Sequence, residues 1–188
     1  MTRSWGDWYV KTSQRSNRAV EDLLKSGVVS KRERALDLGA GGMADAKYLL
    51  SQGFKSVTAV DSSPDSAKYV VDGIDFRCMP AQHFRGDKNS YDLAISCSVL
   101  FHLGSKEEVL QVVRNTFSAL RPGGVFFFNI LGLDDRYFVP ERIRMSPEEL
   151  KDLCGIFPRY QVLIRRRNDN NSRGKALLSH QFLVTAIK

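Results

Sequence analysis

Apolar residues occur along the chain in short runs that alternate with longer amphipathic stretches. Five segments have the length and composition of strands: residues 35–38, 57–60, 75–78, 91–96 and 125–130. The run at 125–130 is almost wholly apolar, which is typical of a strand covered on both faces. Residues 43–51 and 106–120 carry apolar side chains at intervals of three and four, the spacing of one helical face. Strands alternating with helices predict a doubly wound α/β domain with a mostly parallel sheet.

The two ends of the chain depart from this alternation. Residues 160–166 and 181–187 have strand composition with no helix between them, so we expect an antiparallel hairpin with a polar linker over 167–176. A capping-box pattern at Ser146 predicts one more helix before this hairpin. Residues 1–17 are aromatic and basic without periodicity, and we expect them to form a lid or an anchor in front of a helix at 17–26. Residues 1–188 are expected to form one domain.

Composition narrows the class of protein. The 188 residues are 43% hydrophobic and 26% charged, as in a globular protein. No apolar run reaches the roughly 18 residues of a membrane span, and the first residues do not resemble a secretion signal. The three cysteines, Cys78, Cys97 and Cys154, have neither disulfide-motif nor metal-ligand spacing. We therefore expect a cytoplasmic protein with free thiols and no metal.

The positive charge is concentrated in parts of the chain. The net charge is +7, and residues 159–175 hold six basic residues and one acidic one. Such a segment is consistent either with a solvated basic face or with a surface that binds nucleic acid.

The most specific chemistry lies in residues 34–64. Gly39, Ala40 and Gly41 follow the first strand, and a glycine turn there lets a ligand approach the backbone closely. Asp61 ends the second strand 22 residues after Gly39, where an acid accepts hydrogen bonds from ribose hydroxyls. The pattern indicates a site for an adenosine-containing ligand, and a purely structural turn between core strands is the alternative.

The glycine spacing alone leaves two cofactor classes open. Gly39, Gly41 and Ala44 also fit the dinucleotide fingerprint G-x-G-x-x-A, which would indicate an oxidoreductase. Asp37 discriminates between the two, because a carboxylate at this place would repel a pyrophosphate. It suits instead a ligand with an ammonium and a sulfonium, a description that fits S-adenosylmethionine.

The order of motifs resembles that of class I S-adenosylmethionine-dependent methyltransferases from about residue 18 onward. The motifs are LDLGAGG at 36–42, AVDSSP at 59–64, YDLAIS at 91–96 and LRPGG at 120–124. The resemblance implies a Rossmann-like methyltransferase fold with seven strands in the order 3-2-1-4-5-7-6, the last strand antiparallel. It also implies an enzyme that uses S-adenosyl-L-methionine as its cofactor.

Carried over position by position, the resemblance implies most of the cofactor-binding residues. They are Asp37, Gly39, Ala40 and Gly41 at the methionine end, Asp61 at the ribose, Ser62, Ala81 and Gln82 at the adenine, and Ser96 beneath the sulfonium. Arg15 is a further candidate, for the cofactor carboxylate, although an exposed arginine is the alternative. Two positions depart from the family pattern. Met43 replaces a usual third glycine, which narrows the expected pocket, and Pro80 replaces a frequent acid, so that a backbone carbonyl or Gln82 has to substitute.

The compact length, the lead-in at 9–20 and the terminal hairpin are similar to those of the small tellurite-resistance (TehB-like) methyltransferases. This likeness implies that basic hairpin residues approach the reacting centre, and Arg166, Arg167 and Arg173 match those positions loosely. Arg167 and Arg173 are therefore catalytic candidates. His102 is the candidate general base, with a packing role as the alternative.

We expect methyl transfer to a small-molecule acceptor, such as an oxyanion or thiol-like nucleophile, by a monomer or a homodimer. Arginine suits such an acceptor because its charge is permanent. RNA or protein methylation and a catalytically silent cofactor-binding module remain the alternatives. Methylation of an extruded nucleic-acid base is disfavoured, since no N-P-P-Y type tetrapeptide follows Ser96 and no cysteine follows a proline.

Overall fold

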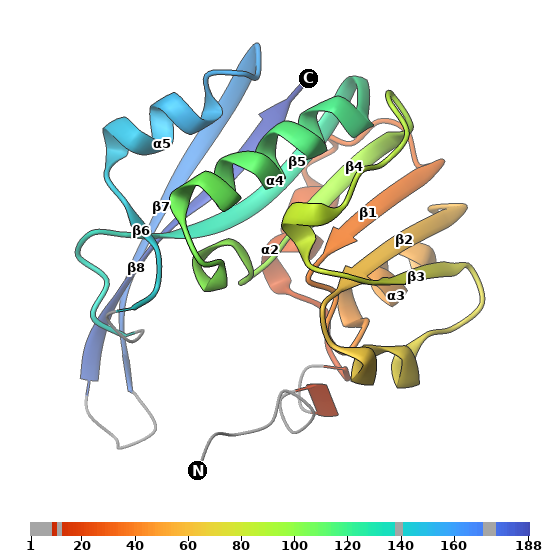
Figure 1. Cartoon of the computed structure of the whole chain (residues 1–188), viewed down its shortest axis with the longest axis horizontal. Helices are drawn as coiled ribbons and strands as arrows, with labels where there is room; N and C mark the ends of the chain where they lie inside the picture. The colour runs from red at the N-terminus through yellow and green to blue at the C-terminus, as the bar shows by residue number, and fades with distance from the viewer. Residues whose placement is uncertain (1–8, 11–12, 138–140, 171–175) are drawn as a thin grey trace.

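One sheet with the order β3-β2-β1-β4-β5-β8-β7 forms the centre of the molecule in the computed structural model, which describes residues 9–10, 13–137, 141–170 and 176–188 (Figure 1). The strands are β1 (Arg34–Leu38), β2 (Ser56–Asp61), β3 (Ile74–Cys78), β4 (Tyr91–Ser96), β5 (Leu120–Gly132), β7 (Arg159–Asn170) and β8 (Ala176–Ile187). The first five pair in parallel, and β8 runs antiparallel to both β5 and β7. The predicted order is confirmed, with β7 and β8 as the sixth and seventh strands. The two-residue β6 (Arg144–Met145) also pairs with β5, and the sequence pattern did not predict it.

Helices cover both faces of the sheet. Figure 1 shows α4 (Lys106–Ala119) and α5 (Pro147–Cys154) on one face and α2 (Arg18–Lys25) and α3 (Ala44–Ser51) on the other. Each face buries its own core, one built on Phe126 and Phe128 of β5 and the other on Val125 and Phe127 of the same strand. Because alternate side chains of a strand point to opposite faces, an almost wholly apolar β5 supplies both cores.

The helix starts follow local chemistry. Asn17 caps α2, Ser105 caps α4, and Ser146 forms the predicted capping box with Glu149 at the start of α5. Each cap satisfies a backbone N–H that has no partner inside its helix. The short helices η1 (Pro64–Tyr69), η2 (Ala81–His83) and η3 (Leu100–His102) follow β2, β3 and β4 and bring their residues to the carboxyl ends of these strands.

Two predicted boundaries were wrong. Residues 167–170 and 176, expected in a polar linker, and residues 177–180, expected in neither strand, belong to the paired strands of the hairpin. Polar and basic side chains are compatible with a strand that has one edge in solvent. Residues 120–124, the LRPGG motif, lie outside the predicted strand at 125–130 but already belong to β5. Trp5, Trp8 and Arg173 lie outside the described residues. Among the described residues, no helix is long and apolar enough to cross a membrane.

Candidate functional site

A cavity of about 680 Å³ lies at the carboxyl ends of β1, β2 and β4. Ligands of open α/β sheets bind at this edge. The glycine turn after β1 forms its floor, and η2, η3 and the N-terminal segment contribute walls. Its lining residues include Tyr9, Arg15, Asn17, Gly39, Ala40, Gly41, Asp45, Asp61, Ser62, Pro80, Ala81, Gln82, Cys97, Val99, His102 and Glu108.

The conformation of the turn requires its first glycine. Gly39 has a φ of +80°, and a Cβ there would come within 2.1 Å of a Val99 methyl carbon. A side chain would therefore meet both backbone strain and a clash. The turn is tied to the second strand, because the backbone N–H of Gly41 donates to Asp61 Oδ2 at 2.9 Å.

Three carboxylates gather beside this turn. Asp37 is 3% exposed, and its Oδ2 has no hydrogen-bond partner among the described residues. Burial, with the nearby charges of Asp45 and Asp61, raises the pKa of Asp37 well above its usual range. Burial also raises the pKa of Asp45 to about 6, although Asp45 accepts a hydrogen bond from the backbone N–H of Asn17 at 2.5 Å. Carboxylates crowded in this way are stabilised by a cation such as an ammonium or a sulfonium.

The half-buried side chain of Gln82, in η2, offers an amide to the cavity. Gln82 lines the cavity, and its side-chain Oε1 is buried with no hydrogen-bond partner among the described residues. Its backbone carbonyl is already engaged, because it accepts hydrogen bonds from Asn115 Nδ2 at 3.2 Å and from Arg85 Nη1 at 2.8 Å. Of the two acceptors of Gln82, the side-chain oxygen is therefore the one without a partner among the described residues.

Two further titratable side chains line the cavity after β4. Burial, and then the positive charge of Arg142, lower the pKa of His102 to about 4, so its imidazole is neutral at physiological pH. Burial, with the charges of Asp45 and Asp37, raises the pKa of Cys97 well above its usual range. A thiol held in its protonated form is a poor nucleophile.

The structure brings most of the predicted site residues together. Arg15, Gly39, Ala40, Gly41, Asp61, Ser62, Ala81, Gln82 and His102 all line the cavity. Asp37 and Ser96 are buried behind this lining. Arg167 lies on β7, exposed and outside the lining, in register with Ser179. Met43 does not narrow the cavity: its φ of 62° turns a fully buried side chain into the core shared with α2 and α3.

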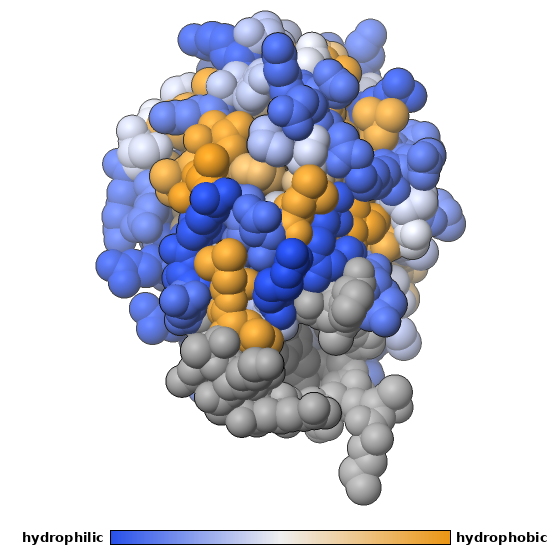
Figure 2. Space-filling view, turned by 90° about the vertical axis from the view of Figure 1, so that its left-hand side faces the viewer, coloured by the Kyte–Doolittle hydropathy of each residue, from blue (hydrophilic) through white to orange (hydrophobic). Residues whose placement is uncertain are grey.

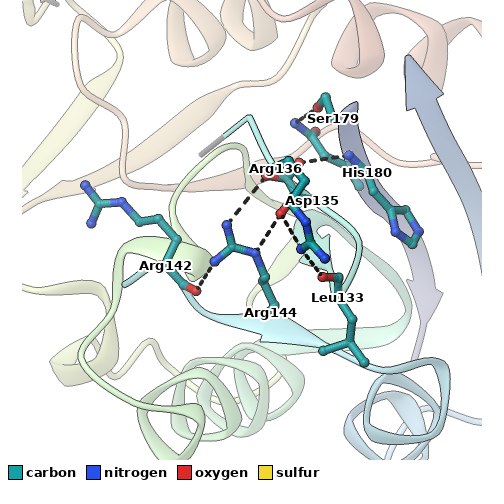
Figure 3. Close-up of polar contacts among 8 residues, drawn as sticks. Leu133, Asp135, Arg136, Arg142, Arg144, Ser179 and His180 are labelled. Atoms are coloured by element: carbon teal, nitrogen blue, oxygen red, sulfur yellow. Dashed lines mark hydrogen bonds and ion pairs between the residues drawn. The ribbon is translucent and has the colours of Figure 1, made fainter. Parts of the chain in front are cut away.

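A polar network holds the segment that follows β5 (Figure 3). Asp135 is fully buried, and its Oδ2 accepts a hydrogen bond from the backbone N–H of His180 on β8 at 2.8 Å. Its Oδ1 lies 3.8 Å from Arg144 Nη2, and its backbone carbonyl accepts from Arg144 Nε at 3.1 Å. Arg144 also donates to the backbone carbonyl of Arg142 at 2.9 Å, so the network fixes the backbone beside η3.

The basic hairpin residues that the structure describes, Arg159 and Arg165 to Arg167, lie on β7, the edge strand of the sheet. Figure 2 views the molecule from the side of α5 and β7 and shows hydrophobic side chains interspersed with strongly hydrophilic ones. Leu163 and Ile164 of β7 are 63% and 54% exposed, and Arg166 next to them pairs with Asp134 at 3.3 Å. The positive charge of β7 therefore lies on an exposed edge of the sheet.

Comparison with known proteins identifies the chemistry of this fold. The family model described as a methyltransferase domain matches residues 36–128, from β1 to β5. The chain therefore contains a methyltransferase domain. No curated protein matches the sequence of this methyltransferase significantly.

Solved structures of the same fold agree with this match. The methyltransferase is similar to TehB from Haemophilus influenzae, with 18% identity, a TM-score of 0.74 and coverage of 98% of this chain and 67% of that chain. It is also similar to Burkholderia thailandensis 1,6-didemethyltoxoflavin-N1-methyltransferase, with bound 1,6-didemethyltoxoflavin and S-adenosylhomocysteine, at 22% identity, a TM-score of 0.66 and coverage of 91% and 77%. A SAM-dependent methyltransferase from Methanosarcina mazei has 17% identity, a TM-score of 0.63 and coverage of 83% and 93%. At these identities the likeness concerns the fold. With the family match, it confirms the predicted methyltransferase class and S-adenosylmethionine as the cofactor.

Three side chains of the methyltransferase site were missed by sequence reasoning. Asp45 is in the first turn of α3, where an acid is common for helix-dipole reasons alone. Asn17 was expected only as the start of a helix, and Glu108 was not singled out within the helix at 106–120. No sequence signal marked these residues as part of a site. Only the tertiary fold brings the starts of α2, α3 and α4 to one cavity.

Proposed function

We propose that this methyltransferase transfers a methyl group from S-adenosylmethionine to a small-molecule acceptor whose nucleophile is an anion or a thiol. The observation that carries the proposal is the cluster of carboxylates beside the glycine turn, with a buried Asp37 oxygen that has no partner among the described residues. Such a cluster suits a ligand with a cationic end and no phosphate.

When bound, S-adenosylmethionine supplies a methyl group on a sulfonium that is readily displaced. Asp61 is the acceptor for the ribose hydroxyls, and Gln82 Oε1 is the acceptor for the adenine amine. Asp37 and Asp45 compensate the charge of the methionine end, and Arg15, which lines the cavity, is the candidate to bind its carboxylate. Each assignment uses a polar group that lines or underlies the cavity.

The acceptor side of the cavity favours a nucleophile that gives up its proton easily. His102 is neutral at physiological pH and is able to take a proton, but a pKa of about 4 makes it a weak base. An acceptor that is already anionic, or a thiol, needs no stronger base. The protein then contributes alignment of the nucleophile and exclusion of water. Arg167 of β7 and Arg173, which lies outside the described residues, are the candidates for orienting a negative charge.

The size of the cavity favours a small acceptor over RNA. A volume of about 680 Å³ is within the usual range of about 300–1,000 Å³ for small-molecule sites. The Burkholderia neighbour was solved with a small molecule, 1,6-didemethyltoxoflavin, bound. RNA remains the second candidate because of the basic residues on the exposed edge of β7.

Calorimetry with S-adenosylhomocysteine tests the cofactor site. We expect binding by the wild-type chain and loss of binding in Asp61→Ala, whereas Asp65→Ala, at a half-exposed position in η1, serves as the matched control. If the wild-type chain does not bind, the proposal is wrong. Binding without methyl transfer to any acceptor would favour the silent module.

Transfer of a labelled methyl group tests the acceptor class. Thiols and oxyanions are compared with total RNA, and we expect incorporation only into the small molecules. Methylation of RNA that declines with salt would favour the second candidate. Arg167→Ala is expected to lower turnover more than cofactor affinity, and equal losses in both would contradict an acceptor-side role.

A further inference from the structure

Tyr9 is buried against the candidate ribose site. Its side chain is 6% exposed and lines the cavity, and its hydroxyl donates a hydrogen bond to Asp61 Oδ1 at 3.0 Å. Its ring lies over the glycine turn, since a Cβ on Gly41 would come within 3.2 Å of it. Burial, and then the charge of Asp61, raise the pKa of Tyr9 to about 12, so the phenol remains a hydrogen-bond donor at physiological pH.

The Tyr9 hydroxyl fills one of the acceptor positions of the Asp61 carboxylate. Oδ1 accepts from the Tyr9 hydroxyl and from the backbone N–H of Ser63 at 2.9 Å, whereas Oδ2 accepts from the backbone N–H of Gly41 at 2.9 Å. A carboxylate has about four acceptor positions, two on each oxygen. Both positions of Oδ1 are filled, so a ribose diol that donates to both oxygens meets an occupied Oδ1.

We propose that Tyr9 is a built-in mimic of a ribose hydroxyl, which holds Asp61 in the cofactor-free protein and is displaced from it when S-adenosylmethionine binds. This inference rests on the proposed function, because it assumes that the ribose binds Asp61. It follows that cofactor binding and release of the Tyr9 hydroxyl are coupled, and that the tyrosine lowers the apparent affinity for the cofactor.

The contact does not extend over the whole cavity. The volume of about 680 Å³ is present with Tyr9 in place, so the adenine and methionine ends are open while the ribose acceptor is engaged. Competition for one carboxylate oxygen therefore predicts a moderate penalty on affinity, and not a complete block of binding.

Calorimetry with S-adenosylhomocysteine on wild type, Tyr9→Phe and Tyr48→Phe tests the inference. Tyr9→Phe keeps the ring but removes the competing hydroxyl, and we expect its Kd to fall about tenfold, which is the lower end of the effect of a hydrogen bond to a charged group. Tyr48→Phe, on α3 outside the cavity lining, is expected to leave the Kd unchanged.

A second ligand makes the result specific to the ribose. For an analogue of S-adenosylhomocysteine that lacks both ribose hydroxyls, Tyr9→Phe should give no gain in affinity, because the ligand then does not compete with Tyr9 for Asp61. An unchanged or weaker affinity of Tyr9→Phe for S-adenosylhomocysteine would overturn the inference, as would the same gain for both ligands. If no variant binds S-adenosylhomocysteine, the proposed cofactor site itself is wrong and the inference with it.

Discussion

The Asp45→Asn variant should be more stable than wild type in the absence of cofactor. It should also bind the cofactor less tightly. The pKa of Asp45 is raised from 3.8 to about 6 by burial. A raised pKa in the folded state means that this group's stabilising contribution is fully present below pH 3.8 and is lost as the pH rises through about 6. At about 1.4 kcal/mol per pH unit, the ionised carboxylate costs the folded state about 3 kcal/mol at pH 7.5.

The amide in Asp45→Asn removes this cost and still offers an oxygen to the backbone N–H of Asn17. Removing the charge also relieves Asp37, whose pKa is raised in part by Asp45. We therefore expect Asp45→Asn to raise the free energy of unfolding by about 1–3 kcal/mol at pH 7.5 and to leave it nearly unchanged at pH 4. The cofactor affinity should decrease about tenfold, since one compensating charge is lost.

Urea unfolding at both pH values, with and without S-adenosylhomocysteine, measures these differences. The exposed Asp22→Asn of α2 serves as the control and should change neither stability nor affinity. An Asp45→Asn variant that is less stable than wild type at pH 7.5, or whose advantage does not disappear on acidification, would refute the electrostatic argument. Such a result would show that the hydrogen bond to Asn17 outweighs the cost of the buried charge.

Three other predictions concern the turn, the network after β5 and the general base. Gly39→Ala should destabilise the fold by about 2–3 kcal/mol and abolish cofactor binding, whereas Gly53→Ala, also at positive φ but with open space around it, should cost only about 1–2 kcal/mol by urea unfolding. Asp135→Ala should cost about 3–5 kcal/mol because it removes the buried carboxylate beside the mostly buried Arg144 and the acceptor of the His180 backbone N–H, and the exposed Asp134→Ala should cost less than about 1 kcal/mol in the same assay. The pH profile of kcat/KM should show no inflection near pH 6.5 from His102, and an inflection there that disappears in His102→Asn would contradict the lowered pKa.

The parts of the fold that depend on local chemistry were predictable. The apolar run at 125–130 predicted a strand buried on both faces, and the capping box at Ser146 predicted the start of α5, because each needs only neighbours along the chain. The hairpin was underestimated, since residues 167–170 are polar and only their pairing with β8 makes them a strand. Met43 was interpreted as a helix residue, but it adopts positive φ before α3, where tertiary burial of its side chain outweighs the strain.

The sequence by itself determined the glycine turn, the acid at the end of β2 and, through Asp37 before the turn, the class of cofactor. These features lie within one strand–helix–strand unit, so local connectivity brings Gly39 and Asp61 together. Only the tertiary structure decided what else surrounds them. Asp45, Gln82 and His102 reach the cavity from three different connections, and Tyr9 reaches Asp61 across 52 residues. Burial and the proximity of charges then set their pKa values, and both are properties of the packed molecule.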